Sequence, residues 1–350
     1  MLVSFIIIAL NAEKTLPSLL DDLRKQSYPH DKIELILVDG QSTDTTKQLM
    51  LAFAEQIDFA RVLVLDNTQK ILPCGWNIAL SHAAGDIILR VDAHASIPSN
   101  FIWNNVKNFK QGEKIVGGPR TSIVDETDDW QKTLLVVESS LFGSGIAYYR
   151  RSKTQKYVST LAHGAYAREV FECVGGYDER CVRTEDNEMH CRMRQAGFRL
   201  FFDPSVRSFH HARNSFGKMC KQKFLNGKWI GLTMGISPRC FSLYHFAPLA
   251  FVLAILGTTV LGVLGIWAFS IALWTCYGLT ALILSITSVI REPFCVQFLA
   301  LPFLFLALHL SYGAGALLGL LKLPIWLRTH KTCENIERVK QTMLQNRRDT

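Results

Sequence analysis

Residues 34–46 read ELILVDGQSTDTT. The run from Glu34 to Val38 predicts a buried β-strand, and Thr43 to Glu55 predicts the helix that follows it. A strand that is apolar on both faces is typical of a parallel sheet that helices cover on each side. Asp39 comes directly after this strand, at the edge of the sheet where α/β proteins bind their ligands.

Strands and helices alternate in the same way on both sides of this segment. Apolar runs predict strands at residues 3–9, 61–65, 86–91 and 114–118, and amphipathic stretches predict helices at 14–25, 75–84 and 184–195. The alternation predicts an α/β fold with a mostly parallel sheet. The sequence contains neither G-x-G-x-x-G nor G-x-x-x-x-G-K-[ST], so it supports neither a dinucleotide-binding fold nor a P-loop.

Polar side chains follow each of the first four predicted strands: Asn11 and Glu13, then Asp39, then Asp66 and Asn67, then Asp92 and His94. A single Asp or Asn at such a position is usually a turn former or a helix cap. Four strand ends that all carry polar residues favour a shared binding site, because the carboxyl ends of parallel strands meet at one edge of the sheet.

The segment Asp92-Ala93-His94 predicts a metal site. A carboxylate at the end of a buried strand is costly unless a cation lies nearby, and Mg²⁺ is commonly held by one or two carboxylates together with phosphate oxygens. His94 is either a further ligand, which would favour Mn²⁺, or a group that supports the ligands. His210 and His211 follow another strand-like run and either could reach the metal or a phosphate; we take His211 as the candidate ligand.

Glu185 and Asp186 open the predicted helix at residues 184–195. Acidic residues are common in a first helical turn because the helix dipole favours them there, which is the plainer explanation. A carboxylate that faces a cleft can instead take a proton from an attacking hydroxyl. Asp186 shares one helix face with Met189 and Met193, so we predict that it points inward and acts as a general base, with Glu185 beside it.

Two long stretches contain no charged residue. No Asp, Glu, Lys or Arg occurs in the 45 residues from Phe246 to Ile290, or in the 29 residues from Pro293 to Leu321. Because a helix needs about 20 apolar residues to cross a bilayer, we predict three hydrophobic segments, at 246–266, 269–290 and 294–321. The expected domains are a catalytic domain at 1–230, an interfacial segment at 231–245, a membrane domain at 246–322 and a basic amphipathic tail at 323–350.

The net charge of +8 comes largely from segments that flank the hydrophobic part. Basic residues beside membrane segments mark the cytoplasmic side and an anionic lipid surface, and residues 216–230 form a basic amphipathic stretch suited to that surface. No nucleic-acid-binding motif accompanies them. The apolar residues 2–10 lack the flanks of a signal peptide, so we expect a strand there and a cytoplasmic catalytic domain. Nine irregularly spaced cysteines without a C-x-x-C pair argue against disulfides and zinc.

Two membrane topologies remain open. Three crossings would place the basic tail on the side opposite the catalytic domain, against the tendency of positive charge to stay inside. Alternatively, the segment from Pro293 to Leu321, which contains Pro302 and a Gly-Ala-Gly sequence at 313–315, is re-entrant and does not cross.

Taken together, these motifs resemble the family-2 glycosyltransferases of the GT-A fold over residues 1–230. Four features of this chain resemble the donor half of that family: the opening strand with its polar loop, VDGQSTD at 38–44, G-x-N at 75–77 and Gly85-Asp86. Three further motifs of this chain resemble the acceptor half of the family: HGAYxRxVF at 163–171, GGYDE at 175–179 and TED at 184–186. The family's Asp-x-Asp stands here as Asp92-Ala93-His94. This variant and the terminal hydrophobic helices make the chain most similar to succinoglycan-type membrane glucosyltransferases of bacterial exopolysaccharide assembly.

The resemblance implies an inverting enzyme of the inner membrane that moves glucose or a similar hexose from a nucleotide diphosphate sugar, expected to be a UDP-sugar, to a polyprenyl-diphosphate-linked saccharide. It assigns the nucleotide sugar to Asn11, Glu13, Asp39, Asn67, Lys70, Asn77 and Asp92. It assigns the acceptor and phosphate side to His163, Gly164, Arg168, Lys221, Lys223 and Trp229. A divalent cation, Mn²⁺ or Mg²⁺, would be held by Asp92, His94 and His211, and catalysis would depend on Asp186 and Glu185.

Two alternatives share the same donor site. A polyprenyl-phosphate sugar synthase would transfer the sugar to the lipid phosphate itself, and only an acceptor assay separates it from the first hypothesis. A membrane-anchored module that binds a nucleotide sugar without catalysis is the non-enzymatic alternative. The presence of Asp39, Asp92 and Asp186 argues against that module.

Overall fold

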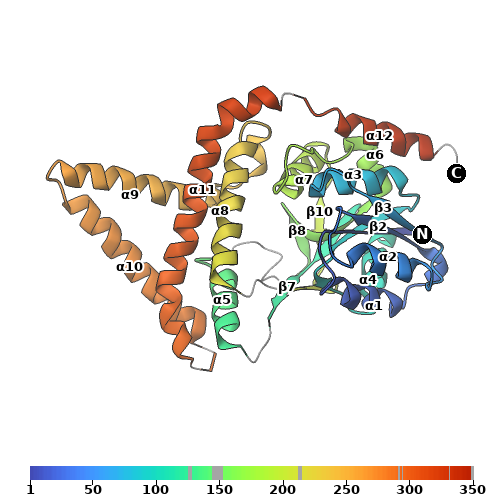
Figure 1. Ribbon diagram of the computed structural model, residues 1–350, viewed down its shortest axis with the longest axis horizontal. Coiled ribbons are helices and arrows are strands. Elements are labelled where there is room, and N and C mark those ends of the chain that lie inside the picture. The colour runs from blue at the N-terminus through green and yellow to red at the C-terminus, as the bar shows by residue number, and fades with distance from the viewer. Residues whose placement is uncertain are drawn as a thin grey trace. The chain divides into compact units, whose positions relative to one another are not determined.

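The computed structural model describes residues 1–124, 128–143, 153–211, 215–290, 292–293, 295–330 and 332–347 (Figure 1). The chain forms two compact units. The first unit comprises residues 1–121, 151–211 and 332–350, and the second comprises residues 122–150 and 212–331.

The first unit is built around an eight-stranded sheet. Its strands are β1 (Val3–Ala9), β2 (Ile33–Asp39), β3 (Arg61–Asp66), β4 (Ile87–Asp92), β6 (Ile115–Gly118), β8 (Lys156–Val158), β9 (Ala162–Ala167) and β10 (Leu200–Phe202). They lie in the order β3-β2-β1-β4-β9-β6-β10-β8. The four strands β3, β2, β1 and β4 are parallel, whereas β9 is antiparallel to both of its neighbours and β8 is antiparallel to β10. The predicted mostly parallel mixed sheet is confirmed.

A second, smaller sheet contains β5 (Ala95–Ser96), β11 (Ser208–His211) and β7 (Arg120–Ile123), in the order β5-β11-β7. Strands β5 and β11 are antiparallel, with His210 opposite Ala95. This pairing brings residues that follow β4 next to residues more than a hundred positions further along the chain.

Helices cover both faces of the large sheet. They are α1 (Leu16–Arg24), α2 (Thr46–Ala54), α3 (Leu72–His82), α4 (Phe101–Lys110), α6 (Arg168–Val174), α7 (Glu185–Gln195) and α12 (Asn335–Asn346), with a short 3-10 helix at His30–Lys32. The connections from β1 to β2 and from β2 to β3 move across the sheet in one direction, and the connection from β3 to β4 moves back. Because such crossovers are right-handed, α1 and α2 cover one face and α3 covers the other.

The ends of the central strands are level with one another. In the register of the sheet, Ala9 lies opposite Asp39, Ile8 lies opposite Asp92, and Asp39 lies opposite Asp66. All seven residues of β2 are buried, as its continuous apolar sequence predicts. The acidic residues that end these strands therefore share one edge of the sheet.

Helix α12, from the predicted basic tail, packs on α3 and α6 of the first unit. Val339 and Met343 of α12 are buried, and the Arg168 guanidinium of α6 donates a 3.0 Å hydrogen bond to the Met343 carbonyl. The apolar face of the tail is thus used inside the first unit.

The second unit is helical. It contains α5 (Asp129–Ser139), α8 (Phe216–Thr233), α9 (Ala247–Val263), α10 (Ala268–Val289) and α11 (Leu301–Thr329), with 3-10 helices at Pro238–Cys240, Leu243–Phe246 and Val296–Ala300. Helices α8 and α11 lie side by side (Figure 1). Their close approach depends on glycine, because a Cβ at Gly227 would lie 2.0 Å from the Tyr312 carbonyl oxygen and a Cβ at Gly315 would lie 2.0 Å from the Phe224 carbonyl oxygen.

Three helical segments of the second unit are long and apolar enough to cross a membrane: Leu243–Val263, Ala268–Val289 and Val296–Thr329. They match the three predicted hydrophobic segments, although the third continues past Leu321 to Thr329. Helix α11 is continuous over 29 residues and contains Pro324 without ending there, so it lacks the turn that a re-entrant loop requires.

Candidate active site

The loop after β2 is held by hydrogen bonds from its own backbone. The buried carboxylate of Asp39 accepts the Ser42 amide at 3.1 and 3.3 Å to its two oxygens. Gln41 has a positive φ of 64°, which turns the chain sharply after Gly40. Asn67 reaches the same place from β3, because its amide donates to the Asp39 carbonyl at 2.7 Å and its side chain donates to the Ile71 carbonyl at 2.8 Å.

Asn11 and Glu13 fix the loop after β1 against the loop after β2. The Asn11 side-chain oxygen accepts the Thr43 amide at 2.8 Å, and the Asn11 amide donates to the Ser42 hydroxyl at 3.0 Å. Glu13 accepts the Thr45 hydroxyl at 3.0 Å. Asn11 itself has a φ of 50°, a conformation that Asn tolerates better than most residues. These two side chains therefore shape the rim around Asp39.

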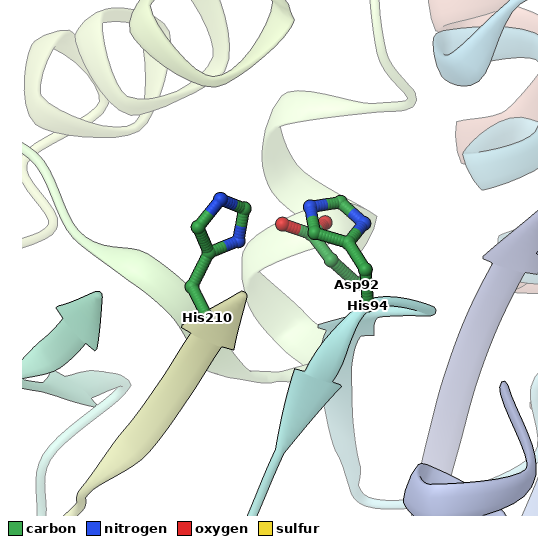
Figure 2. A group of neighbouring side chains, drawn as sticks. All are labelled: Asp92, His94 and His210. Atoms are coloured by element: carbon green, nitrogen blue, oxygen red, sulfur yellow. The ribbon is translucent and has the colours of Figure 1, made fainter. Parts of the chain in front are cut away.

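Asp92, His94 and His210 form a group whose ligand atoms all lie within 4.8 Å of one another. Figure 2 shows their side chains gathered in one space, with His210 projecting from β11 and Asp92 and His94 from the end of β4 and the residues after it. The rings of His94 and His210 meet edge to face, with centroids 4.5 Å apart. One carboxylate and two imidazoles are a donor set that suits Mn²⁺ and other first-row divalent ions.

His210 has an unsatisfied buried nitrogen that fits this assignment. Within the described residues, its Nδ1 atom has no hydrogen-bond partner. Burial lowers the pKa of His210 to about 2, so the imidazole is neutral and offers a lone pair. Since buried polar atoms normally have partners, a cation beside Asp92 would satisfy this nitrogen. The side chain of His211, the predicted ligand, lies outside the described part of the structure.

His163 forms a hydrogen bond with the carboxylate of Asp92. Its Nε2 atom lies 3.2 Å from Asp92 Oδ2 and its Nδ1 atom lies 2.8 Å from the Ser208 hydroxyl. A carboxylate only accepts, so Nε2 carries the hydrogen and Nδ1 accepts from Ser208. Burial opposes the charge on Asp92, but the bond from His163 and the charge of Arg120, 3.7 Å away, outweigh it and hold the pKa of Asp92 well below its usual range.

Arg90 connects Asp186 to β4. Its buried guanidinium forms an ion pair with both carboxylate oxygens of Asp186, donates to the Tyr177 hydroxyl at 3.0 Å and lies 4.3 Å over the Trp76 ring. Residues two apart on a strand point to the same face of a sheet. Asp186, held by Arg90, and Asp92 therefore lie on the same side of β4.

Glu185 is buried beside Asp186, whose side chain is more exposed. Burial, together with the neighbouring charge of Asp186, raises the pKa of Glu185 to about 8. Its Oε2 atom has no hydrogen-bond partner among the described residues, whereas the Asp186 side chain is one-third exposed. At neutral pH the raised pKa favours a protonated, neutral Glu185, beside an Asp186 side chain that solvent reaches.

Several other predicted site residues hold the architecture together. Asn77 exchanges hydrogen bonds with the Tyr177 backbone, at 2.7 Å to its amide and 2.9 Å to its carbonyl, and so fixes the turn that carries Tyr177. Arg168 donates to the Ala83 carbonyl at 2.7 Å and pairs with Glu172 at 3.1 Å.

Gly164 and Lys70 are the remaining predicted binding residues in the first unit. Gly164 lies in β9, where a Cβ would come within 2.6 Å of the Tyr166 hydroxyl. Lys70 is exposed after β3 and has a positive φ of 61°.

The predicted residues of α8 belong to the second unit. Lys223 is buried and lies 3.1 Å from Glu138 of α5, and Trp229 packs edge to face on Trp326 of α11. Lys221 is exposed. The structure thus gives Lys223 and Trp229 packing contacts within the second unit.

Arg90 and Arg120 are site residues that the sequence motifs did not predict. A signal for Arg90 was present, because an arginine inside the apolar run IILRVD at 87–92 must be paired if the strand is buried. Arg120 has no comparable signal, since it reaches Asp92 only through the folding of the smaller sheet.

Comparison with known proteins identifies the domain that carries this site. The model of the family described as "Glycosyl transferase family 2" matches residues 4–175. Residues 4–175 belong to glycosyltransferase family 2. The matched segment contains Asp39, Arg90, Asp92 and His163.

Two curated relatives resemble the chain over most of its length. A dolichyl N-acetyl-α-D-glucosaminyl phosphate 3-β-D-2,3-diacetamido-2,3-dideoxy-β-D-glucuronosyltransferase of Methanococcus voltae is 25% identical over 328 residues, which cover 91% of this chain and 97% of the relative. The succinoglycan biosynthesis protein ExoA of Rhizobium meliloti (strain 1021) is 26% identical over 228 residues, 64% of this chain and 67% of the relative.

Among solved structures, a mannosyltransferase of Pyrobaculum calidifontis in complex with GDP-Man and Mn²⁺ aligns with a TM-score of 0.55 at 17% identity. The alignment covers 90% of this chain and 86% of that protein. This likeness shows the fold that the sequence motifs predicted, the GT-A glycosyltransferase fold.

Proposed function

We propose that the protein is an inverting, metal-dependent glycosyltransferase that moves a hexose from a UDP-sugar to a polyprenyl-linked saccharide at the inner membrane. The observation that carries the proposal is the ion pair between Asp186 and Arg90, which stands two residues before Asp92 on β4. This pair supports a site in which the solvent-accessible carboxylate of Asp186 and the metal ligand Asp92 act on the same side of one strand. The name of one curated relative, a transferase that acts on a dolichyl-phosphate-linked sugar, supports transfer to a lipid-linked saccharide. The name of the other, a succinoglycan biosynthesis protein, supports a role in polysaccharide assembly.

The nucleotide half of the donor is assigned to the strand ends around Asp39. Its carboxylate is buried and fixed by the Ser42 amide, so it is oriented before a base or ribose arrives. Asn11 and Glu13 complete the rim from β1, and Asn67 completes it from β3.

Asp92, His94 and His210 would hold the divalent cation. When bound there, the cation would offset the charge that develops on the leaving diphosphate. His163 and Arg120 keep Asp92 ionised and fixed in orientation. Such outer hydrogen bonds orient metal ligands in many sites.

The chemical step is a single displacement at the anomeric carbon. The acceptor hydroxyl attacks that carbon while Asp186 takes its proton, the new glycosidic bond forms, and the bond to the diphosphate oxygen breaks with UDP as the leaving group. Arg90 occupies one lone-pair position on each oxygen of Asp186, which leaves further positions for the acceptor hydroxyl. One base and direct attack give inversion of configuration.

The proposal is tested by an assay of UDP release and product formation. Purified protein with Mn²⁺ is offered a panel of UDP-hexoses and two acceptors, a polyprenyl phosphate and a polyprenyl-diphosphate-linked sugar. Asp186→Asn is expected to abolish transfer. Glu188→Gln is the matched control, because Glu188 lies on the same helix and pairs with Arg192 instead of Arg90. Transfer to the lipid phosphate alone would favour the polyprenyl-phosphate sugar synthase, and full activity of Asp186→Asn would overturn the assigned base.

A further inference from the structure

The two ends of the membrane-associated unit are tied to the same folded domain. Strand β11, which precedes the second unit, pairs with β5 inside the first unit. Helix α12, which follows the second unit, also belongs to the first: the Gly176 amide donates to the Ile336 carbonyl at 3.0 Å, and Asn346 donates to the Ser81 carbonyl at 3.0 Å. An open sheet with its covering helices does not cross a bilayer, so β11 and α12 lie on one side of the membrane.

Helices α8 and α11 run parallel to each other. A Cβ built at Gly227 would meet Tyr312, one at Gly231 would meet Ala316, and one at Gly235 would meet Leu323. Each step along α8 thus matches a step in the same direction along α11. At the other end of the pair, Met219 lies in a buried cluster with Leu301, Leu304 and Phe305. The start of α8 lies beside the start of α11, and the end of α8 lies beside the last turns of α11.

Short links join opposite ends of this pair to the first unit. Four residues separate His211 of β11 from Phe216, the first residue of α8, and five separate Thr329 of α11 from Asn335 of α12. A link of this length reaches about 20 Å when fully extended. The links therefore limit how far the start and the end of the pair can lie from β11 and α12, the elements to which they are joined.

A crossing orientation is incompatible with these two links. If α11 crossed the bilayer, its start and the adjacent start of α8 would lie beyond a hydrocarbon core about 30 Å thick. The link of residues 212–215, which includes Arg213, would then have to pass back through that core. It is too short, and an arginine in the core costs several kcal/mol.

We infer that α11, with α8 and α5 packed along it, lies in the plane of the membrane on the lipid headgroup surface, and that only the α9–α10 hairpin enters the hydrocarbon core. The catalytic unit and the C-terminal tail then lie on the same side of the membrane. The number of crossings is even.

The side chains of the three in-plane helices suit a lipid surface. Exposed charges are carried by α8, at Lys218 and Lys221, and by α5, at Asp129 and Lys132. Most of the exposed side chains of α11 are apolar, with Phe303, Leu321 and Ile325 each about 70% exposed, and its exposed charges, Lys322 and Arg328, lie near its end. The three helices together thus expose charged and apolar side chains, a combination that suits the boundary between lipid headgroups and acyl chains.

The α9–α10 hairpin has a different character. Only 11% of the residues in the apolar window of each helix are buried, against 44% for α11. Large apolar side chains are exposed around both helices, and the turn between them, at 264–267, is itself apolar. The start of α9 and the end of α10 contact the in-plane helices and the residue that follows α5. Pro248 of α9 is adjacent to Gly313 of α11, and Ser288 of α10 hydrogen-bonds to Ser140 at 3.1 Å. The hairpin thus inserts from one side.

The first test locates the tail. A single cysteine is introduced at Glu337 of α12 or, as the control, at Lys110 of α4; both positions are exposed. Labelling with a membrane-impermeant maleimide is measured in spheroplasts and in inverted vesicles, with the wild-type protein as the background for its native cysteines. Labelling of both positions from the same side is expected. Labelling of Glu337→Cys only from the side opposite Lys110→Cys would overturn the inference.

The second test measures the depth of α11 itself. Phe303, Ala314 and Ile325 are exposed and, at 11-residue spacing, share one helix face. Nitroxides at these three positions in lipid nanodiscs are compared by collision with oxygen and with a water-soluble nickel complex, after subtraction of the labelled wild-type protein. Three similar, shallow depths are expected for α11. In α10, the central position Leu279 should be deeper than Phe269 and Ile290. A deep Ala314 between two shallow ends would refute the in-plane orientation.

Discussion

The adjacent acidic residues Glu185 and Asp186 should respond in opposite ways to the loss of charge. With a pKa of about 8, about one-tenth of Glu185 is ionised at pH 7, so Glu185→Gln replaces a mostly neutral group with a neutral group of the same shape. We expect Glu185→Gln to keep the turnover number within about 10-fold of the wild type. Asp186→Asn removes the proton acceptor and should lower it by about 100- to 10,000-fold, the usual contribution of a general base.

The raised pKa of Glu185 can also be tested by measuring how the free energy of unfolding changes with pH. The pKa of Glu185 is higher in the folded chain than the ordinary value of 4.5, so the folded state binds the extra proton between about pH 4.5 and pH 8. The stability associated with that proton is fully present below pH 4.5 and is lost as the pH rises to 8. The slope is about 1.4 kcal/mol per pH unit. In Glu185→Gln this contribution to the slope should vanish.

The assay combines UDP release with thermal unfolding in detergent from pH 5 to pH 8, for the wild type and both variants. Because Asp186→Asn leaves the buried cation of Arg90 without its partner, its melting temperature and UDP affinity are measured first to confirm that it is folded. Equal losses of turnover in the two variants would refute the distinction between the carboxyl groups. So would a pH slope in Glu185→Gln identical to that of the wild type.

Three further predictions follow from the contacts of the first unit. Arg90→Met should lower turnover by about 100-fold with little change in the donor KM, because it releases Asp186 from its fixed position. The control Arg192→Met removes an ion pair within α7, the helix of Asp186, and should leave turnover near that of the wild type. Equal effects of the two variants would contradict a positioning role for Arg90. Met343→Ala should destabilise the first unit by about 2–5 kcal/mol in a denaturation experiment, and an unchanged midpoint would show that α12 is not docked. His210→Ala should weaken Mn²⁺ binding in titration calorimetry by about 10-fold or more, and unchanged affinity would remove His210 from the site.

The parallel half of the fold could be predicted from the sequence because each strand carries its own signal. The predicted strand at 3–9 coincides with β1, and the predicted segment 34–38 lies within β2 at Ile33–Asp39. Both strands are continuous apolar runs bounded by polar loops. The region from 121 to 162 gave no clear pattern; within it, β8 at Lys156–Val158 is short and partly exposed and so carries little signal of its own.

The partners of the site residues were harder to predict, because they depend on long-range pairing. Asp186 meets Arg90 across 96 positions, and His163 meets Asp92 across 71. Sequence spacing predicted the end of the sheet at which these residues act but not which cation faces which carboxylate. The docking of α12 could not be predicted from its sequence pattern. An amphipathic basic helix beside membrane segments fits a lipid surface as well as it fits α3 and α6.

The central claim, that Asp39, Asp92 and Asp186 serve one diphosphate-binding pocket in separate roles, is tested most directly by UDP binding in titration calorimetry with and without Mn²⁺. The account predicts that Asp92→Asn abolishes the Mn²⁺-dependent part of UDP affinity, and that Asp39→Asn weakens UDP binding both with and without the metal. Asp186→Asn should bind UDP as tightly as the wild type while transferring no sugar. Mn²⁺-dependent UDP binding that survives in Asp92→Asn, or transfer by Asp186→Asn at close to the wild-type rate, would contradict these roles.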